Sequence, residues 1–272
     1  MRLFISDYDG TYLRSMGDEM TQLQLNSEAV AKWRQLGGLF GFSTGRIFPL
    51  IEMEINKYPL EIDFMVVANG ALVLDEKLQV IRQHLIDPEL IVHIVNYLNQ
   101  ERSLNFICSD GWDGYHSEQI MKNSSMKQVM TRLKEAGYFN LTLDEVISRG
   151  IAQFSVVDLS PEEVEVLSKE LECQFGNALT VYPNRTSIDL SPKNISKATG
   201  IKDLLNYLDL GADQVICMGD SWNDIEMIQT YKGITVPEAP EILKELAVEC
   251  YSSVREALLC SIQSVIYKGG KC

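Results

Sequence analysis

Short apolar runs that end on polar residues recur at the start of the chain. Buried strands are predicted at residues 3–6, 39–42 and 64–68. A helix is predicted between the first two strands, at residues 26–36, because Asn26-Ser27-Glu28 resembles a helix cap and two glycines follow residue 36. Strands that alternate with helices in this way indicate βαβ units and a parallel sheet.

The pattern changes after residue 75, where shorter strands and helices suggest a separate α+β segment. The α/β pattern resumes from Ile188, with a helix predicted at 196–208 and a very apolar strand at 214–218. The segment between them begins with a predicted hairpin at 72–74 and 79–82. Further strands are predicted at 105–108, 151–157 and 179–182, and helices at 87–100, 117–136 and 161–172.

Composition describes an ordinary globular chain of 272 residues, with 46% hydrophobic and 23% charged residues. No apolar run approaches the ~20 residues that span a bilayer. Residues 1–6 already form a predicted strand, so we expect no signal peptide and a cytoplasmic location. The net charge of −14 argues against nucleic acid or an anionic membrane as a partner. The negative net charge does not exclude an anionic substrate, because a bound metal can make the electrostatic potential of a pocket positive.

The cysteines and histidines form no ligand motif. The six cysteines are scattered without a C-x-x-C pair, which favours reduced thiols over disulfides or a zinc site. Cys217 lies within an apolar run and is expected to be buried.

Polar clusters follow the predicted strands, and these carry the candidate chemistry. Ligands of parallel α/β sheets gather beyond the carboxyl ends of the strands. Asp7 and Asp9 would repel one another if both were ionised, and Mg²⁺ would relieve that repulsion. The alternative is a turn with solvated acids. The four clusters are Asp7 with Asp9, Thr44-Gly45-Arg46, Lys197, and Asp220 with Asn223 and Asp224.

Taken in order, D-x-D-G-T, T-G-R, a lysine at a helix start and G-D-x-x-N-D resemble the four motifs of the haloacid dehalogenase (HAD) superfamily. The chain closely resembles the Cof-like sugar-phosphatase branch, whose large α/β cap is inserted between the second and third motifs. The resemblance spans nearly the whole chain. It implies a Rossmann-like parallel-sheet core at 1–80 and 186–272, with helices on both faces, and an α+β cap at 81–185 that selects the substrate.

The resemblance implies covalent catalysis on a phosphate ester. Asp7 would be the nucleophile that forms an aspartyl-phosphate. Asp9 would protonate the leaving group and then take a proton from the attacking water. Gly10 would allow a tight turn around the phosphate, and Thr11 would support that turn.

The same resemblance assigns the substrate contacts. Thr44 would donate its hydroxyl and Gly45 its N–H to the phosphoryl oxygens. Lys197 would stabilise both the nucleophile and the phosphoryl charge. Asn223 would contact the phosphate or a water of the metal. Arg46 is expected either to contact substrate or to form a structural ion pair.

Mg²⁺ is the implied cofactor. Its ligands would be the side chains of Asp7 and Asp220 and the backbone carbonyl of Asp9. Asp224 would not bind the metal itself but would orient Lys197 or a metal-bound water.

Two lysines compete for the third motif. Lys197 is favoured because Gly200 and Leu204 follow it at the family spacing, although Ala198 stands where glycine is usual. Lys193 follows a proline in a predicted loop and is expected to be solvated.

These observations predict a Mg²⁺-dependent phosphatase that acts on small phosphorylated metabolites such as sugar phosphates, as a monomer or homodimer. Two alternatives stay open. A sugar phosphomutase would use the same motifs, and a non-catalytic sensor of phosphorylated metabolites would signal through cap closure. The sensor would be expected to lack Asp9 or Lys197, and both are present.

Overall fold

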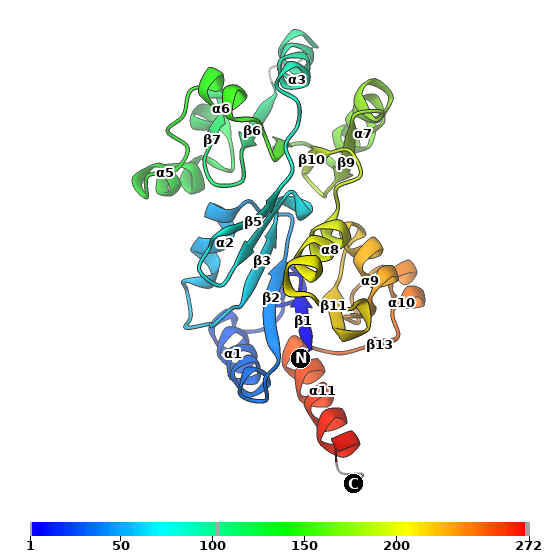
Figure 1. Cartoon of the computed structure of the whole chain (residues 1–272). Coiled ribbons are helices and arrows are strands. Elements are labelled where there is room, and N and C mark those ends of the chain that lie inside the picture. Colours follow the sequence, from blue (N-terminus) through cyan, green and yellow to red (C-terminus); the bar gives the residue numbers. More distant parts are fainter. Residues whose placement is uncertain (1, 102–103, 270–272) are drawn as a thin grey trace. The chain divides into compact units, whose positions relative to one another are not determined.

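The computed structural model describes residues 2–101 and 104–269, which form two compact units (Figure 1). The core unit comprises the described residues of Met1–Gly45, Met53–Arg82 and Lys197–Cys272. The inserted unit comprises those of Arg46–Glu52 and Gln83–Ser196. Each unit has its own sheet.

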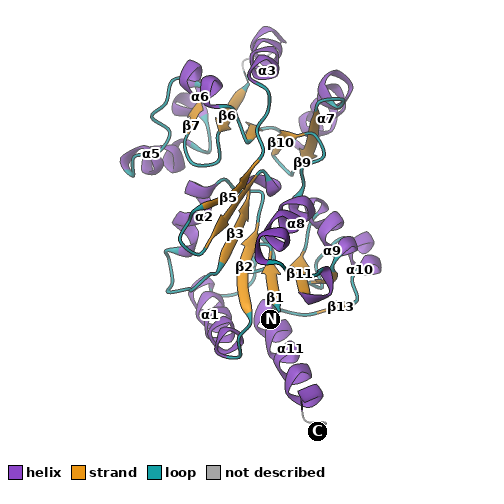
Figure 2. Cartoon of the chain, in the orientation of Figure 1, coloured by secondary structure: helices purple, strands orange, loops and turns teal. Residues whose placement is uncertain are grey.

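The core unit is built on an eight-stranded sheet of order β13-β12-β11-β1-β2-β3-β4-β5 (Figure 2). Neighbouring strands from β13 to β3 are parallel, and β4 runs antiparallel to β3. The strands are β1 (Leu3–Ser6), β2 (Leu39–Ser43), β3 (Phe64–Val67), β4 (Leu72–Asp75), β5 (Val80–Gln83), β11 (Val215–Gly219), β12 (Lys232–Thr235) and β13 (Glu249–Cys250).

Helices cover both faces of this sheet (Figures 1 and 2). Helix α1 lies against α11, whereas α8 lies against α9. Right-handed crossovers place helices on opposite faces when the chain leaves the sheet centre in opposite directions. The helices are α1 (Glu19–Gln35), α8 (Lys197–Leu208), α9 (Ile225–Thr230), α10 (Glu241–Leu246) and α11 (Val254–Gly269), with α2 (Phe48–Ile55) shared between the units.

The strand order reverses between β1 and β11. From β1 the chain moves to β2 on one side, and from β11 it moves to β12 on the other. Such a switch point opens a crevice beyond the carboxyl ends of the strands, where ligands of α/β sheets bind. Asp7 directly follows β1, and Asp220 directly follows β11.

The inserted unit contains a five-stranded antiparallel sheet of order β7-β6-β8-β10-β9. Its hydrophobic core includes Phe106, Phe154 and Leu190 of the sheet together with Ile94 and Leu167 of the helices. The elements are α3 (Pro88–Glu101), β6 (Asn105–Ser109), β7 (Gly114–His116), α4 (Glu118–Asn123), α5 (Lys127–Glu135), α6 (Leu143–Arg149), β8 (Gln153–Val157), α7 (Pro161–Phe175), β9 (Leu179–Pro183) and β10 (Ser187–Pro192).

The predicted fold class, a parallel α/β core with helices on both faces and an additional α+β sheet, is confirmed. The prediction of a helix starting at Asn26 is wrong, because α1 begins at Glu19, where Asp18 caps it. The single helical segment expected at 117–136 is two helices, α4 and α5.

Strand β10 differs from the expectation that the core would resume at residue 186. It pairs with β8 and β9, so residues 187–192 complete the inserted sheet. The core unit resumes only at Lys197. The apolar alternation of Ile188 and Leu190 indicated a strand, but it carried no information about which sheet the strand would join.

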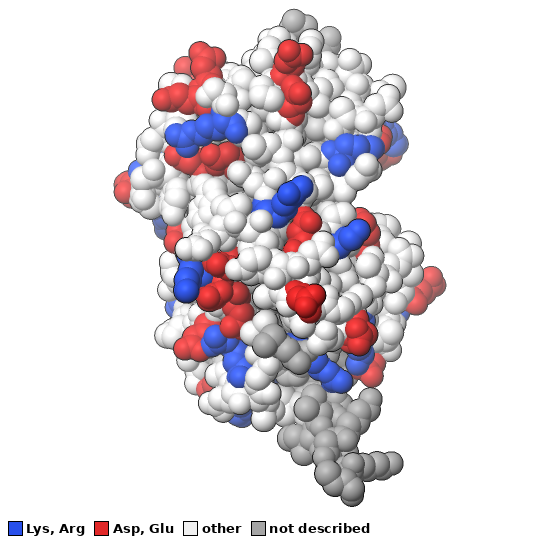
Figure 3. Space-filling view, viewed as in Figure 1, with Lys and Arg blue, Asp and Glu red and all other residues white. Residues whose placement is uncertain are grey.

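In the described part of the chain, no helix is long and apolar enough to cross a bilayer. On the face shown in Figure 3, lysines and arginines are interspersed with acidic side chains and form no continuous basic patch.

Candidate active site

Asp7 is held at the end of β1 by the neighbouring strand. Its backbone N–H donates to the carbonyl of Met218 in β11 over 2.8 Å, which continues the parallel ladder one residue past the strand. The residue is only 4% exposed. A carboxylate so deeply buried requires a partner, because burying an unpaired charge is costly.

Lys197 is that partner. It is the first residue of α8 and is 1% exposed. Its Nζ donates to Asp7 Oδ1 over 2.7 Å and to Asp224 Oδ1 over 2.6 Å. Lys193 lies elsewhere, in the inserted unit, where its Nζ bonds to the carbonyls of Gly176 and Leu179. Of the two candidate lysines, the structure therefore brings Lys197 to Asp7.

Asp224 accepts hydrogen bonds both from its own loop and from Lys197. Its Oδ2 accepts from the backbone N–H groups of Asp220 and Ser221 at 3.0 and 2.9 Å, and its Oδ1 accepts from Lys197. A Cβ on Gly219 would lie 2.4 Å from the carboxyl carbon of Asp224, so only glycine allows this close approach. Asp224 thereby fixes both the lysine and the loop that carries Asp220.

Asp220 meets the loop that follows β1. Thr11, which is buried, donates from Oγ1 to Asp220 Oδ1 over 2.8 Å and so joins the two strand ends. Gly10 has a positive φ of 82°, and a Cβ there would lie 2.3 Å from Asp220 Oδ2. Gly10 is therefore required both by the turn and by the approach of this carboxylate.

Negative charge predominates in this cluster. Burial raises the pKa of Asp7 well above its usual value, Lys197 opposes the rise, and the charges of Asp224 and Asp220 add to it. Burial, followed by the charge of Asp224, raises the pKa of Asp220 to about 6. Burial would lower the pKa of Lys197, but Asp224 and Asp7 outweigh it and raise that pKa. One ammonium thus faces three carboxylates.

The donor set fits a hard divalent cation. Among the described residues, Asp7, Asp220 and Asp224 form an acidic group with ligand atoms within 4.8 Å of one another. All are carboxylate oxygens, the ligands that Mg²⁺ prefers. The raised pKa values of Asp7 and Asp220 mean that their charged forms are disfavoured here, and a bound cation would relieve this. Because Lys197 and two backbone N–H groups already occupy Asp224, Asp7 and Asp220 are the better ligands.

Thr44 and Gly45 form a second loop of the core unit, after β2. Asn69 binds this loop through its backbone N–H, which donates to the Thr44 carbonyl over 3.1 Å. A Cβ on Gly45 would lie 3.1 Å from Asn69 Oδ1 and 3.4 Å from Asn223 Nδ2. Asn223 Nδ2 in turn donates to Asn69 Oδ1 over 3.0 Å. The structure therefore brings Thr44, Gly45 and Asn223 together around Asn69.

Asp9 and Arg46 are the remaining predicted site residues of the first two clusters. Asp9 is exposed, although its charge is near enough to contribute to the raised pKa of Asp220. Arg46 belongs to the inserted unit, where its guanidinium reaches the Leu50 carbonyl at 3.5 Å.

A family comparison accounts for this arrangement. The model of the haloacid dehalogenase-like hydrolases matches residues 4–257 and so covers both units and all four clusters. The chain belongs to this family. The predicted family and the prediction that the chain is an enzyme are confirmed.

Relatives of this HAD-like hydrolase span the same length. A 5-amino-6-(5-phospho-D-ribitylamino)uracil phosphatase from Bacillus subtilis is 25% identical over 251 residues, which are 91% of this chain and 88% of the relative. A haloacid dehalogenase-like hydrolase from Bacteroides thetaiotaomicron superposes with a TM-score of 0.74 at 19% identity, covering 94% of this chain and 98% of the other. A sugar phosphatase of HAD subclass IIB also gives 0.74, at 17% identity, covering 98% and 99%. The two structures share the fold.

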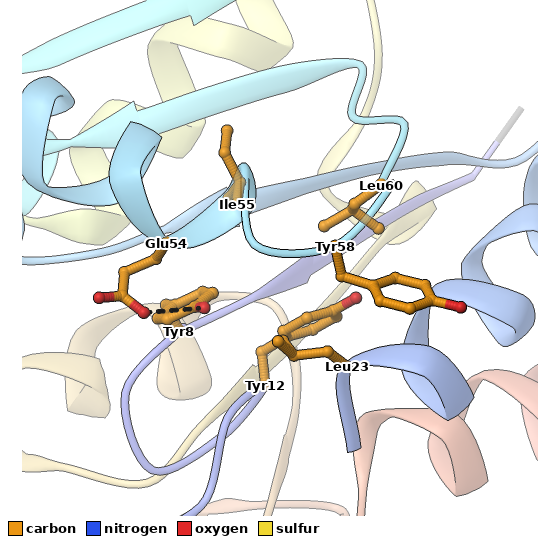
Figure 4. Close-up of a pocket in the computed structure, with 7 residues that line it drawn as sticks. All are labelled: Tyr8, Tyr12, Leu23, Glu54, Ile55, Tyr58 and Leu60. Atoms are coloured by element: carbon orange, nitrogen blue, oxygen red, sulfur yellow. Dashed lines mark hydrogen bonds between the residues drawn. The ribbon is translucent and has the colours of Figure 1, made fainter. Parts of the chain in front are cut away.

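Behind the Asp7–Asp9 loop of this HAD-like hydrolase lies a small cavity of about 10 Å³ (Figure 4). Tyr8 and Tyr12 line it, and their rings stack with centroids 5.9 Å apart. The hydroxyl of Tyr8 donates to Glu54 over 3.4 Å, as Figure 4 shows. These two tyrosines flank the Asp9-Gly10-Thr11 turn in the sequence, and both rings pack edge-on against Phe42 of β2.

Asn69 is the residue that sequence reasoning missed. It was not among the site residues predicted from the sequence. The available signal was its position, since it follows β3 as the other clusters follow β1, β2 and β11.

Proposed function

We propose that this chain is a Mg²⁺-dependent phosphatase that hydrolyses small phosphorylated metabolites such as sugar phosphates. The observation that carries the proposal is the buried Lys197 bridging Asp7 and Asp224, with Asp220 beside them at the switch point of the sheet. The names of the relatives, a phosphatase of a phosphorylated ribitylamino-uracil and a sugar phosphatase, support this substrate class.

Asp7 is the proposed nucleophile. One of its carboxylate oxygens forms a bond to phosphorus while the bond between phosphorus and the ester oxygen breaks. Asp9 gives its proton to the departing alkoxide, and its side chain is exposed. The product of this step is an aspartyl-phosphate and a free alcohol.

Hydrolysis restores the enzyme. Asp9, now ionised, takes a proton from a water molecule whose oxygen attacks phosphorus, and the bond to Asp7 breaks to release inorganic phosphate. Lys197 neutralises charge on Asp7 and the phosphoryl group throughout, and Asp224 holds its ammonium in place. Thr44, Gly45 and Asn223 bind the phosphoryl oxygens.

Asp7, Asp220 and the backbone carbonyl of Asp9 would hold Mg²⁺. When bound, the ion supplies neutralising charge to the carboxylates and to the phosphoryl oxygens. The inserted unit is proposed to act as the cap that selects substrates.

The test is release of inorganic phosphate from a panel of phosphorylated sugars, nucleotides and cofactors, with and without Mg²⁺. Asp7→Asn should lower turnover by about three or more orders of magnitude in a folded protein, because a carboxamide cannot form the acyl phosphate. Near-normal turnover by Asp7→Asn would refute the nucleophile. Turnover that requires an added sugar bisphosphate and returns phosphate to sugar would identify a phosphomutase instead.

A further inference from the structure

Asn69 has an unusual backbone for a residue that follows a strand. Ala68 and Asn69 both have a φ of 52°, in the left-handed region. Asparagine tolerates this region better than most residues, whereas alanine does not. Left-handed residues without a glycine store strain, and such strain often accompanies a functional site. Asn69 is also fully buried, with 0% of its surface exposed.

The side-chain amide of Asn69 is the end of a hydrogen-bond chain. Ser221 Oγ donates to Asn223 Oδ1 over 2.7 Å, and Asn223 Nδ2 donates to Asn69 Oδ1 over 3.0 Å. In this arrangement the Asn223 oxygen accepts from the Ser221 hydroxyl, and the Asn223 nitrogen faces Asn69. The oxygen of Asn69 is thereby the acceptor, and Nδ2 is left as a donor.

No hydrogen-bond partner for Asn69 Nδ2 exists within the described residues. A buried amide donor without a partner is costly, and most such groups in native proteins are satisfied by a ligand, water or protein atom. A Cβ built on Gly45 would lie 3.3 Å from this nitrogen, so the donor lies beside the Thr44-Gly45 loop. That loop is the proposed phosphoryl site, which requires donors and offers an anionic acceptor.

We propose that Asn69 is a further residue of the phosphoryl site: its Nδ2 donates to an oxygen of the bound phosphoryl group, and its Oδ1 orients Asn223. The inference rests on the proposed function. It adds a donor from the end of β3 to those contributed by the ends of β2 and β11. A charge-assisted hydrogen bond of this kind is stronger than a neutral one, so its loss should be measurable as weaker binding of phosphate.

Two substitutions separate the backbone from the side chain. Asn69→Gly removes the amide but keeps a residue that accepts the left-handed φ. Asn69→Asp keeps the shape and the acceptor for Asn223 but replaces the donor with an oxygen that repels an anion. Asn194→Gly is the matched control, because Asn194 is also left-handed, at φ 62°, and is exposed in the inserted unit.

The probe is inorganic phosphate, titrated by calorimetry into the full chain with Mg²⁺ present. Asn69→Gly should bind phosphate about tenfold more weakly than wild type, and Asn69→Asp about a hundredfold more weakly. With a substrate from the hydrolysis panel, KM should rise more than kcat falls. Asn194→Gly should match wild type in every measurement, and circular dichroism should show all variants folded.

Phosphate affinity of Asn69→Gly and Asn69→Asp equal to that of wild type would overturn the inference, as would a wild-type chain that binds no phosphate at millimolar concentration. The titration needs no turnover. Failure to hydrolyse any ester would therefore count against the proposed function alone, and a loss of phosphate affinity in the variants would still assign Asn69.

Discussion

At the scale of single residues, the site depends on one buried lysine that is shared by two carboxylates. Lys197 contacts Asp7 and Asp224 at 2.7 and 2.6 Å, and all three side chains are almost fully buried. Removing one member of a buried ion pair leaves the other charge uncompensated. A lysine in this position therefore stabilises the site as well as the chemistry proposed for it.

We expect Lys197→Ala to lower kcat/KM by about a hundredfold or more, because it removes a preorganised charge from the nucleophile and the phosphoryl group. Lys193→Ala should change kcat/KM little, since Lys193 is exposed and its Nζ bonds to the backbone carbonyls of Gly176 and Leu179. Steady-state kinetics on one substrate compares the two. The reverse order of sensitivity would mean that Lys193 is the lysine of the third motif.

At the scale of elements, helix α1 contains Asn26, which the sequence suggested as a helix cap but which instead bonds to two other segments of the core unit. Asp18 caps the helix by accepting from the N–H of Thr21 over 2.8 Å. Asn26 lies within the helix and is buried. Its Nδ2 donates to the Tyr12 carbonyl over 2.7 Å, and its Oδ1 accepts from the N–H of Arg255 over 3.0 Å. Asn26 thereby ties α1 to the loop that follows β1 and to α11.

Asn26→Ala should therefore lower the free energy of unfolding by about 1–3 kcal/mol, because the buried carbonyl of Tyr12 and the partly buried N–H of Arg255 lose their partner. Gln24→Ala is the matched control on the same helix. Gln24 is exposed, and its loss should change the unfolding free energy by less than about 0.5 kcal/mol. Urea denaturation measures both. Equal effects of the two substitutions would show that Asn26 contributes nothing beyond helix propensity.

At the scale of the whole molecule, the core fold brings like charges together at the edge of its sheet. The raised pKa of Asp220, about 6 against an ordinary 3.8, means that the metal-free native state holds a proton that the unfolded chain has already released. Between about pH 4 and pH 6 the unfolded state therefore binds fewer protons than the native state. The metal-free protein should lose stability as pH rises through this window.

Mg²⁺ should reverse that loss, because it competes with the proton for the same carboxylates. We expect Mg²⁺ to raise Tm more at about pH 7.5 than at about pH 5, where protons occupy the ligands. Thermal unfolding with Mg²⁺ or with EDTA at the two pH values provides the measurement. A Tm shift independent of pH, or full activity in excess EDTA, would argue against these ligands.

The inserted unit has a sheet and a hydrophobic core of its own, so it can move as one body. A cap that closes over its substrate excludes bulk water and accepts small molecules. We expect turnover of several small phosphate esters and very little of phosphoserine in a folded protein. A higher kcat/KM on the phosphoprotein would show that the inserted unit is not a closing cap.

Much of the architecture follows from local sequence. Apolar runs such as 3–6 and 214–218 mark buried strands, and the polar residues after them must lie at one edge of a parallel sheet. This reasoning predicted the fold class, and the order of the four motifs predicted the family. It also placed Asp7, Lys197 and Asp220 together, as their positions in the structure show.

Other features depend on contacts between distant segments. The sequence could not assign β10 to the inserted sheet, because its apolar alternation fits either sheet. Nor could it single out Asn69, whose role depends on the burial of its amide between Gly45 and Asn223. The sequence by itself determined the elements and the residue types of the site, because strand and helix periodicity and motif spacing are local. Only the tertiary structure decided which strands pair and which polar atoms meet, because those depend on residues brought together from across the chain.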